Sequence, residues 1–259
     1  YHDGSLLFDE DGRNYIVYGN DEIWITELNE DLTAPKKDGL HRLLVSDHKN
    51  PELGYEGSHI QKINGYYYIF LVHSLRDRWM RTEACFYSDS LEGEFTGGDV
   101  LCDDRGYCGQ GVAQGGIVDT PDGKWYAMLF QDSGAVGRIP ILLPVTWKDH
   151  FPVFGQNGHV PEEIEVHSTR PGYIYQPLVG SDDFCNGLLP RWQFNHDPDP
   201  RYYHLDALQG TYTITTREVC TELTQAVNTL TQRMSYPSCA AEVTVDAVSY
   251  THLRAHETE

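Results

Sequence analysis

The sequence predicts an all-β protein, a β-propeller that is followed by part of a second β domain. Strand-turn-strand patterns recur along the first half of the chain, with turns at Asp11-Gly12, Asn64-Gly65 and Asp122-Gly123. These turns lie roughly 55 residues apart, an interval typical of propeller blades. The 24 Gly and 17 Tyr residues agree with this fold, since it consists of short strands joined by tight turns.

Each of the three units joins a hairpin to one further strand. The hairpins cover residues 5–19, 59–71 and 116–130, and the further strands cover 22–28, 84–88 and 140–147. Asp-Gly and Asn-Gly between apolar runs are strong hairpin signals, because these residues tolerate a positive φ angle. The run Tyr66-Tyr67-Tyr68 in the second hairpin is expected to pack between blades, since alternate strand residues face opposite sides.

The alternative is a β-sandwich whose hairpins are evenly spaced by coincidence. Three matching units favour the propeller, but three blades do not close a ring, since propellers usually have about four to eight. We therefore expect at least one blade ahead of Tyr1 and a partial further blade over Pro140 to Val160.

The pattern changes after the third unit. Residues 166–180, which contain Pro171-Gly172 and Pro177, are interpreted as a linker. Residues 181–248 are interpreted as a second β domain, with strands expected at 211–216 and 241–248. About 70 residues are too few for a whole sandwich, which needs on the order of 100, so this domain is expected to be partial. Residues 249–259 do not continue the strand pattern and are excluded as a non-native tail.

The composition excludes several classes of partner. The formal net charge of -20 argues against nucleic acid and against an anionic membrane surface, because both require clustered Lys and Arg. None of the 6 cysteines forms a Cys-x-x-Cys pair of the kind that binds zinc. A neutral ligand fits better, and abundant aromatic rings suit sugars, since each ring offers a flat apolar face and a polar edge. The acidity alone fits simple solubility equally well.

Two carboxylates stand at the starts of predicted hairpins. Glu56 is followed by Gly57 ahead of the second hairpin, where a rigid strand edge can hold it against a ligand. Asp3 precedes the first hairpin in the same way. Glycoside hydrolysis needs carboxyl groups on opposite sides of one bond, usually from different elements, so the two are candidates for acid–base chemistry. Alternatively, each is an exposed loop carboxylate without a catalytic role.

Four segments, in their order along the chain, resemble glycoside hydrolase family 43. They are residues 2–8 with Asp11-Gly12, residues 56–59, residues 114–119 and residues 134–140. The family includes β-xylosidases and α-L-arabinofuranosidases, and its members are five-bladed propellers. The resemblance covers residues 1–165 and implies a propeller that lacks its first blade. Residues 181–248 resemble part of the concanavalin A-like sandwich, a jelly roll, that follows the propeller in many β-xylosidases, so the chain is expected to be truncated at both ends.

The resemblance implies a role for each matching residue. Glu56 matches the general acid, Asp3 matches the residue that tunes the pKa of that acid, and Arg138 matches an arginine that contacts the sugar. The planar guanidinium of an arginine can hold two hydroxyl groups. Further candidates for lining the substrate pocket lie beside these matches, namely His59, Gln131 and Phe130.

The resemblance also implies two departures from the family pattern. The general base is an Asp in the blade ahead of Asp3, so this chain is expected to lack it and to be impaired in hydrolysis. Gln114 stands where many members carry a His beside a calcium ion. No cofactor is expected to be required, but a structural calcium bound through the Gln114 carbonyl is left open.

The expected reaction is the inverting removal of terminal xylose or arabinofuranose from xylo- or arabinoxylo-oligosaccharides. The alternative is a propeller that binds carbohydrate without catalysis. A structural module with no ligand is disfavoured, because it leaves the acidic and basic residues at the matched positions unexplained. The sequence leaves the cellular compartment open.

Overall fold

A computed structural model describes residues 1–234 and 238–245 of the chain. Within these residues the regular structure is β-strand apart from two single-turn 3-10 helices, η1 (Gly134–Val136) and η2 (Leu223–Gln225). None of the described helices has the length and apolar character needed to cross a membrane. The chain divides into two compact units, Tyr1–His167 and Ser168–Glu259, which are described separately below.

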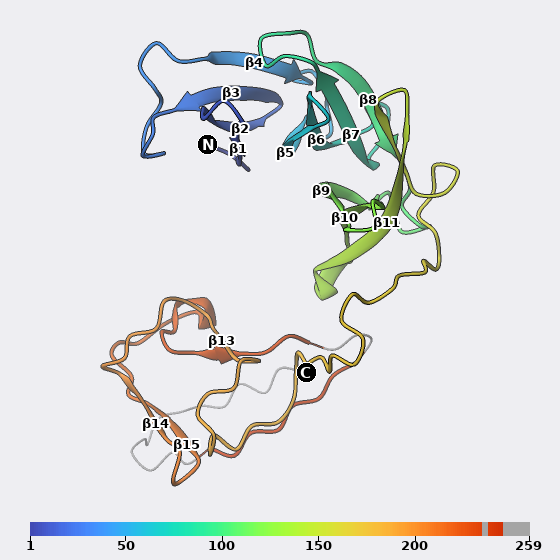
Figure 1. Cartoon of the computed structure of the whole chain (residues 1–259). Helices are drawn as coiled ribbons and strands as arrows, with labels where there is room; N and C mark the ends of the chain where they lie inside the picture. The colour runs from blue at the N-terminus through green and yellow to red at the C-terminus, as the bar shows by residue number, and fades with distance from the viewer. Residues whose placement is uncertain (235–237, 246–259) are drawn as a thin grey trace. The chain divides into compact units, whose positions relative to one another are not determined.

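The first unit contains three four-stranded antiparallel sheets, each formed by strands consecutive in the sequence (Figure 1). The first sheet consists of β1 (Ser5–Phe8), β2 (Asn14–Asn20), β3 (Glu22–Leu28) and β4 (His41–Ser46). The second consists of β5 (Glu56–Ile63), β6 (Tyr66–Ser74), β7 (Arg81–Ser88) and β8 (Thr96–Leu101). The third consists of β9 (Ala113–Asp119), β10 (Trp125–Asp132), β11 (Arg138–Lys148) and β12 (Phe151–Phe154).

These three sheets are blades of a β-propeller, as the sequence predicts. Strand β5 contacts β1 on one side and β9 on the other, so the first strands of the three blades lie next to one another. The arc of sheets in Figure 1 has these first strands on its inner side. Residues at the starts of β1 and β5 are therefore brought together although more than 50 positions separate Asp3 from Glu56 in the sequence.

A tight turn joins the first two strands of each blade. Asn64 and Gly65 both have positive φ angles, 51° and 85°, as a two-residue turn matching the strand twist requires. In the first and third hairpins only the glycine is left-handed, with φ of 83° at Gly12 and 78° at Gly123. The predicted turn positions are correct in all three blades.

The expected partial blade over Pro140 to Val160 is wrong. Pro140 lies within β11, which pairs with β10 from Arg138 to Val145, and β12 then pairs with β11, so both strands complete the third blade. Residues 140–147 are correctly assigned to the third unit, and the error lies in β12, a strand of four residues whose short pattern does not show that it belongs to the same blade.

The core of the first unit lies between blades, and β6 divides it. Ile69 and Leu71 are fully buried against the first blade, whereas Phe70 packs against residues of the third. Because successive strand residues face opposite sides, a strand covered on both faces is a continuous apolar run. The same alternation places Tyr67 and Tyr68 in the two different cores, which confirms that the tyrosine run packs between blades.

The described part of the second unit contains two small antiparallel sheets. One pairs β13 (Gln193–Phe194) with β16 (Leu230–Thr231), and the other pairs β14 (Tyr203–Asp206) with β15 (Thr211–Ile214). Strand β15 confirms the strand expected from residue 211. Residues 241–245 form no strand, residues 246–248 lie outside the described residues, and so does the excluded tail, residues 249–259.

Candidate active site

The backbone at Asp3 and Glu56 is fixed by turns and by one buried hydroxyl group. Glu56 is the first residue of β5, and the pairing of β5 with β6 shifts register directly after it. Gly57 has a φ angle of 64° and Asp3 one of 42°, so both segments bend sharply. The buried Ser58 hydroxyl lies 3.0 Å from the carbonyl oxygens of Asp3 and Val17. This hydroxyl therefore fixes the segment around Asp3 against the start of β5.

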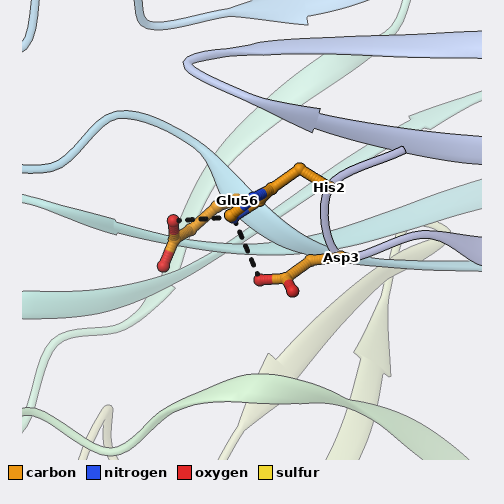
Figure 2. A group of neighbouring side chains, drawn as sticks. All are labelled: His2, Asp3 and Glu56. Carbon is orange, nitrogen blue, oxygen red and sulfur yellow. Dashed lines mark ion pairs between the residues drawn. The ribbon is translucent and has the colours of Figure 1, made fainter.

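The side chain of His2 lies between the two carboxylates (Figure 2). Its Nε2 atom is 3.5 Å from Asp3 Oδ2 and 3.5 Å from Glu56 Oε2. Glu56 is 21% exposed, whereas Asp3 is 44% exposed, so the proton donor candidate is the more enclosed of the two acids. The structure thus brings the two predicted acidic residues together and adds an imidazole that the sequence analysis did not identify.

The three ligand atoms of His2, Asp3 and Glu56 lie within 4.8 Å of one another. Among the described residues, no other group of three His, Cys, Asp or Glu side chains is as closely spaced. The ion pairs through His2 account for this spacing, and we assign no metal ion to it.

Asn20, the last residue of β2, completes the acidic side of the site. Its Nδ2 atom donates a hydrogen bond of 3.1 Å to Glu56 Oε2 and lies 3.5 Å from His2 Nε2. The sequence analysis did not single out Asn20, because 36 residues separate it from Glu56. Its place in the Gly19-Asn20-Asp21 turn beside a predicted strand end is the only sequence signal that could have indicated it.

A second group of residues surrounds Phe130 on β10. The guanidinium carbons of Arg81 and Arg138 each lie 4.6 Å from the centre of the Phe130 ring. Asp132 joins the two arginines, because its carboxylate is 3.0 Å from Arg81 Nη1 and 3.4 Å from Arg138 Nε. The structure therefore places the predicted residues Phe130 and Arg138 together and adds Arg81 and Asp132.

The two arginines differ in their access to solvent. The side chain of Arg81 is 5% exposed, whereas that of Arg138 is 65% exposed. Burial is the largest effect on Arg81 and lowers its pKa, and the nearby charge of Arg138 lowers it further. The carboxylate of Asp132 raises the pKa, as do the smaller effects of Glu83 and Glu56, but the net shift is downward. Arg138 is the arginine that a ligand can reach.

Gln114 lies against the backbone that follows Glu56. Its φ angle is 70°, and a Cβ atom built on Gly57 would lie 2.6 Å from Gln114 Nε2. The backbone N–H of Gln114 donates a hydrogen bond of 2.6 Å to Oε2 of Glu83, which is fully buried on β7. Gly57 is therefore needed for the close approach of Gln114, which is an additional reason for a glycine after Glu56.

His59 is part of β5, the first strand of the second blade, and its side chain lies next to β9, the first strand of the third. A Cβ atom built on Gly116 of β9 would be 3.6 Å from the imidazole of His59. His59 is exposed, but neighbouring protein atoms still lower its pKa by desolvation, and the charge of Asp3 opposes this effect. This environment suits a neutral imidazole next to the acidic group.

Gln131 is buried away from these groups. Its Nε2 atom donates hydrogen bonds of 2.7 Å and 2.8 Å to the carbonyl oxygens of Asp104 and Gln110. Because Gln131 follows Phe130 on one strand, the two side chains face opposite sides of the blade. Its amide group is committed to the loop between β8 and β9.

Two family models match separate parts of the chain, one within the first unit and one within the second. The model described as "Glycosyl hydrolases family 43" matches residues 1–152. The model described as "Beta xylosidase C-terminal Concanavalin A-like domain" matches residues 181–252. The first match covers more than half of the chain and all three blades except the last two residues of β12.

The names of similar proteins refer to family GH43 or to xylosidase, xylanase and arabinofuranosidase activities. A protein of Xylanibacter ruminicola, provisionally named a β-xylosidase, is 26% identical over 267 residues, which cover 98% of this chain and 48% of that protein. A solved structure of a bifunctional GH43-CE protein of Bacteroides eggerthii is 42% identical, with a TM-score of 0.77 over 92% of this chain and 31% of that one. A GH43 glycoside hydrolase engineered to display endo-xylanase and exo-arabinofuranosidase activity is 28% identical, with a TM-score of 0.74 over 92% of this chain and 45% of that one. The chain thus spans about half the length, or less, of the relatives it matches.

Proposed function

The chain belongs to glycosyl hydrolase family 43, and from this we propose that it forms part of an enzyme that removes terminal xylose or arabinofuranose from xylan-derived oligosaccharides. The observation that carries the proposal is the meeting of Glu56 and Asp3, from two blades, around His2. Relatives named as β-xylosidases and as an α-L-arabinofuranosidase support the substrate class.

In the proposed reaction Glu56 is the general acid. Its proton moves to the glycosidic oxygen while the bond from that oxygen to the sugar breaks, and water attacks the opposite face of the sugar. This water loses its proton to a general base, which the family resemblance places in the blade ahead of the one that contains Asp3. Asp3 takes the tuning role that the resemblance implies. The product sugar has the inverted configuration.

Arg138 and Phe130 are proposed to bind the sugar. The exposed guanidinium of Arg138 offers planar donors to neighbouring hydroxyl groups, and Asp132 fixes its Nε side. His59 is proposed to line the pocket beside the acids. Gln131 is left out of the proposed pocket because its amide is committed to backbone carbonyls.

No metal-dependent step is proposed. Protein calcium sites supply about six to eight oxygen ligands, many of them carboxylates. Gln114 offers one neutral oxygen, and among the described residues no group of carboxylates gathers around it. The donor set at Gln114 therefore does not fit a calcium site built from this chain alone.

The test is hydrolysis of an aryl β-xyloside and an aryl α-L-arabinofuranoside. Two proteins are compared, namely this chain and the same chain extended at its N-terminus with the corresponding segment of a full-length relative. We expect turnover by the extended chain and loss of most of it in Glu56→Gln on substrates with poor leaving groups. Glu52→Gln, which changes an exposed loop residue four positions earlier, is the matched control.

The outcomes distinguish the proposal from its rival. Unchanged hydrolysis by Glu56→Gln contradicts the assignment of the acid. If neither protein hydrolyses a glycoside but xylo-oligosaccharide still binds, the chain is a carbohydrate-binding propeller. The preferred substrate of an active protein identifies the sugar.

A further inference from the structure

The two carboxyl oxygens of Glu56 have different surroundings. Oε2 accepts the hydrogen bond from Asn20 Nδ2 at 3.1 Å and lies 3.5 Å from His2 Nε2. In the part of the chain that the structure describes, no hydrogen bond or ion pair reaches Oε1. Figure 2 shows the carboxyl group of Glu56 turned toward His2 through one oxygen, with the other directed away. One oxygen is therefore held by the first blade and the other is free.

Asn20 is held by a rigid part of the first blade. It pairs with Glu22 at the closed end of the β2–β3 hairpin. The preceding Gly19 has a φ angle of 147°, and a Cβ atom there would lie 1.9 Å from the Glu22 carbonyl oxygen. The Gly19 N–H also donates a hydrogen bond of 3.0 Å to the His2 carbonyl. Asn20 can therefore hold its amide in one position relative to the acid.

An amide N–H can donate a hydrogen bond but cannot accept one. A neutral carboxylic acid carries its proton on one oxygen and leaves the other as an acceptor. A donor aimed at Oε2 disfavours a proton on Oε2, because the hydroxyl oxygen of a carboxylic acid is a weaker acceptor than its carbonyl oxygen. The proton is therefore favoured on Oε1, the oxygen without a protein partner.

We propose that Asn20 is a positioning residue that keeps the acidic proton of Glu56 on Oε1, where it can reach the glycosidic oxygen. The inference rests on the proposed function, since it assigns a role in the same proton transfer. When the proton leaves Oε1 and the glycosidic bond breaks, Glu56 becomes a carboxylate. The hydrogen bond from Asn20 then becomes charge-assisted and stronger, so it stabilises the transition state more than the ground state.

The contact between Asn20 and Glu56 is tested without turnover. In the 259-residue chain, NMR follows the side-chain amide resonances of Asn20 and the carboxyl carbon of Glu56 as the pH changes. We expect the two to titrate together and the amide resonances to lose this pH dependence in Glu56→Gln. Amide resonances that do not follow Glu56 overturn the proposal.

Two substitutions distinguish proton positioning from packing. Asn20→Ala removes the donor, whereas Asn20→Asp keeps the shape but replaces the donor with an acceptor that draws the proton to Oε2. On substrates with poor leaving groups, we expect kcat/KM to fall about fivefold for Asn20→Ala, the equivalent of one hydrogen bond, and further for Asn20→Asp. On activated aryl glycosides, which need little protonation, both variants should stay close to wild type.

A packing role predicts the opposite order, with Asn20→Asp milder than Asn20→Ala and equal losses on both kinds of substrate. That result overturns the proposal. Asn29→Asp, which adds the same charge after the far end of β3, is the matched control. If the N-terminally extended chain, with Asn20 and Glu56 unchanged, hydrolyses no glycoside, the proposed function fails and the catalytic role of Asn20 fails with it. The NMR titration then still decides whether the contact with Glu56 exists.

Discussion

The carboxyl group of Glu83 accepts a 2.6 Å hydrogen bond from the backbone N–H of Gln114 and is otherwise enclosed by protein. Its second oxygen, Oε1, has no hydrogen-bond partner among the described residues. Burial raises the pKa of Glu83 well above its usual value, while the hydrogen bond from Gln114 and the charge of Arg81 oppose the rise. The second blade therefore contains an acid that is neutral over a wider pH range than an exposed one.

This raised pKa predicts an unusual dependence of stability on pH. The folded chain holds the Glu83 proton above pH 4.5, the ordinary pKa of a glutamate carboxyl group, whereas the unfolded chain releases it there. The contribution of Glu83 to stability is thus fully present below about pH 4.5 and is lost as the pH rises toward the folded pKa. We expect Glu83→Gln to be more stable than wild type at pH 8 by on the order of 1–2 kcal/mol, with a smaller difference at pH 5.

Denaturant unfolding followed by tryptophan fluorescence at both pH values measures this difference. An equal difference at pH 5 and pH 8 would show that Glu83 does not titrate between the folded and unfolded states in this range. Glu92→Gln, at an exposed position after β7, serves as the control.

A second prediction concerns Gly57. In Gly57→Ala the new Cβ atom would meet Gln114 at 2.6 Å, and the φ angle of 64° is itself unfavourable for alanine. We expect a loss of about 2–3 kcal/mol in the free energy of unfolding, together with weaker glycoside hydrolysis, because Glu56 is adjacent.

The control for Gly57→Ala separates the two causes. Gly65 has a φ angle of 85°, but a Cβ atom there would meet nothing within 4 Å. Gly65→Ala therefore measures the backbone cost alone, about 1 kcal/mol. Equal losses for the two substitutions would mean that the contact with Gln114 has no energetic weight.

The blades could be predicted because their signals are local. Asn64-Gly65 and the two Asp-Gly turns specify hairpins through a few residues, and the repeat interval then specifies the architecture. The fourth strand of the third blade, β12, could not be predicted, because a run of four residues carries too little pattern to identify a strand. The family resemblance identified Glu56 and Asp3 through motifs of a few residues each.

The partners of these residues required the folded chain. Asn20 and His2 reach Glu56 only because the first strands of neighbouring blades meet, and no local pattern specifies which side chains then face one another. Gln131 shows the converse limit, since it is adjacent to Phe130 in sequence but faces the opposite side of the blade. Side chains alternate between the two faces of a strand, so Phe130 and Gln131 could have been assigned to opposite faces if β10 had been known to extend through both.

Asp132 is predicted to hold Arg138 in its binding position. Its carboxylate pairs with Arg138 and with the buried Arg81. In Asp132→Asn both pairs lose their charge but the shape is kept, so we expect KM to rise several-fold with a smaller change in kcat. Asp122→Asn, which breaks an exposed pair with Lys124 in the same blade, should leave both unchanged. A fall in kcat at constant KM would contradict the binding role of Arg138.

The carboxylate of Asp9 predicts the acid stability of the contact between the first two blades. It accepts hydrogen bonds of 2.6 Å from Lys62 and 2.5 Å from the hydroxyl of Tyr67. Burial raises the pKa of Asp9, but these hydrogen bonds outweigh burial and lower the pKa below 3.8, the ordinary value for an aspartate. The resulting stability is present above about pH 4 and is lost as the pH falls through the lowered pKa.

We expect Asp9→Asn to lower the free energy of unfolding by about 2–4 kcal/mol at pH 7, because it leaves the charge of Lys62 without its buried partner. The difference from wild type should shrink as the pH falls below 4, since the wild-type carboxylate is then protonated as well. Denaturant unfolding at pH 7 and pH 3 measures it, with the exposed Asp11→Asn as the control. A difference that stays constant down to pH 3 would mean that the shape of Asp9, and not its charge, holds the two blades together.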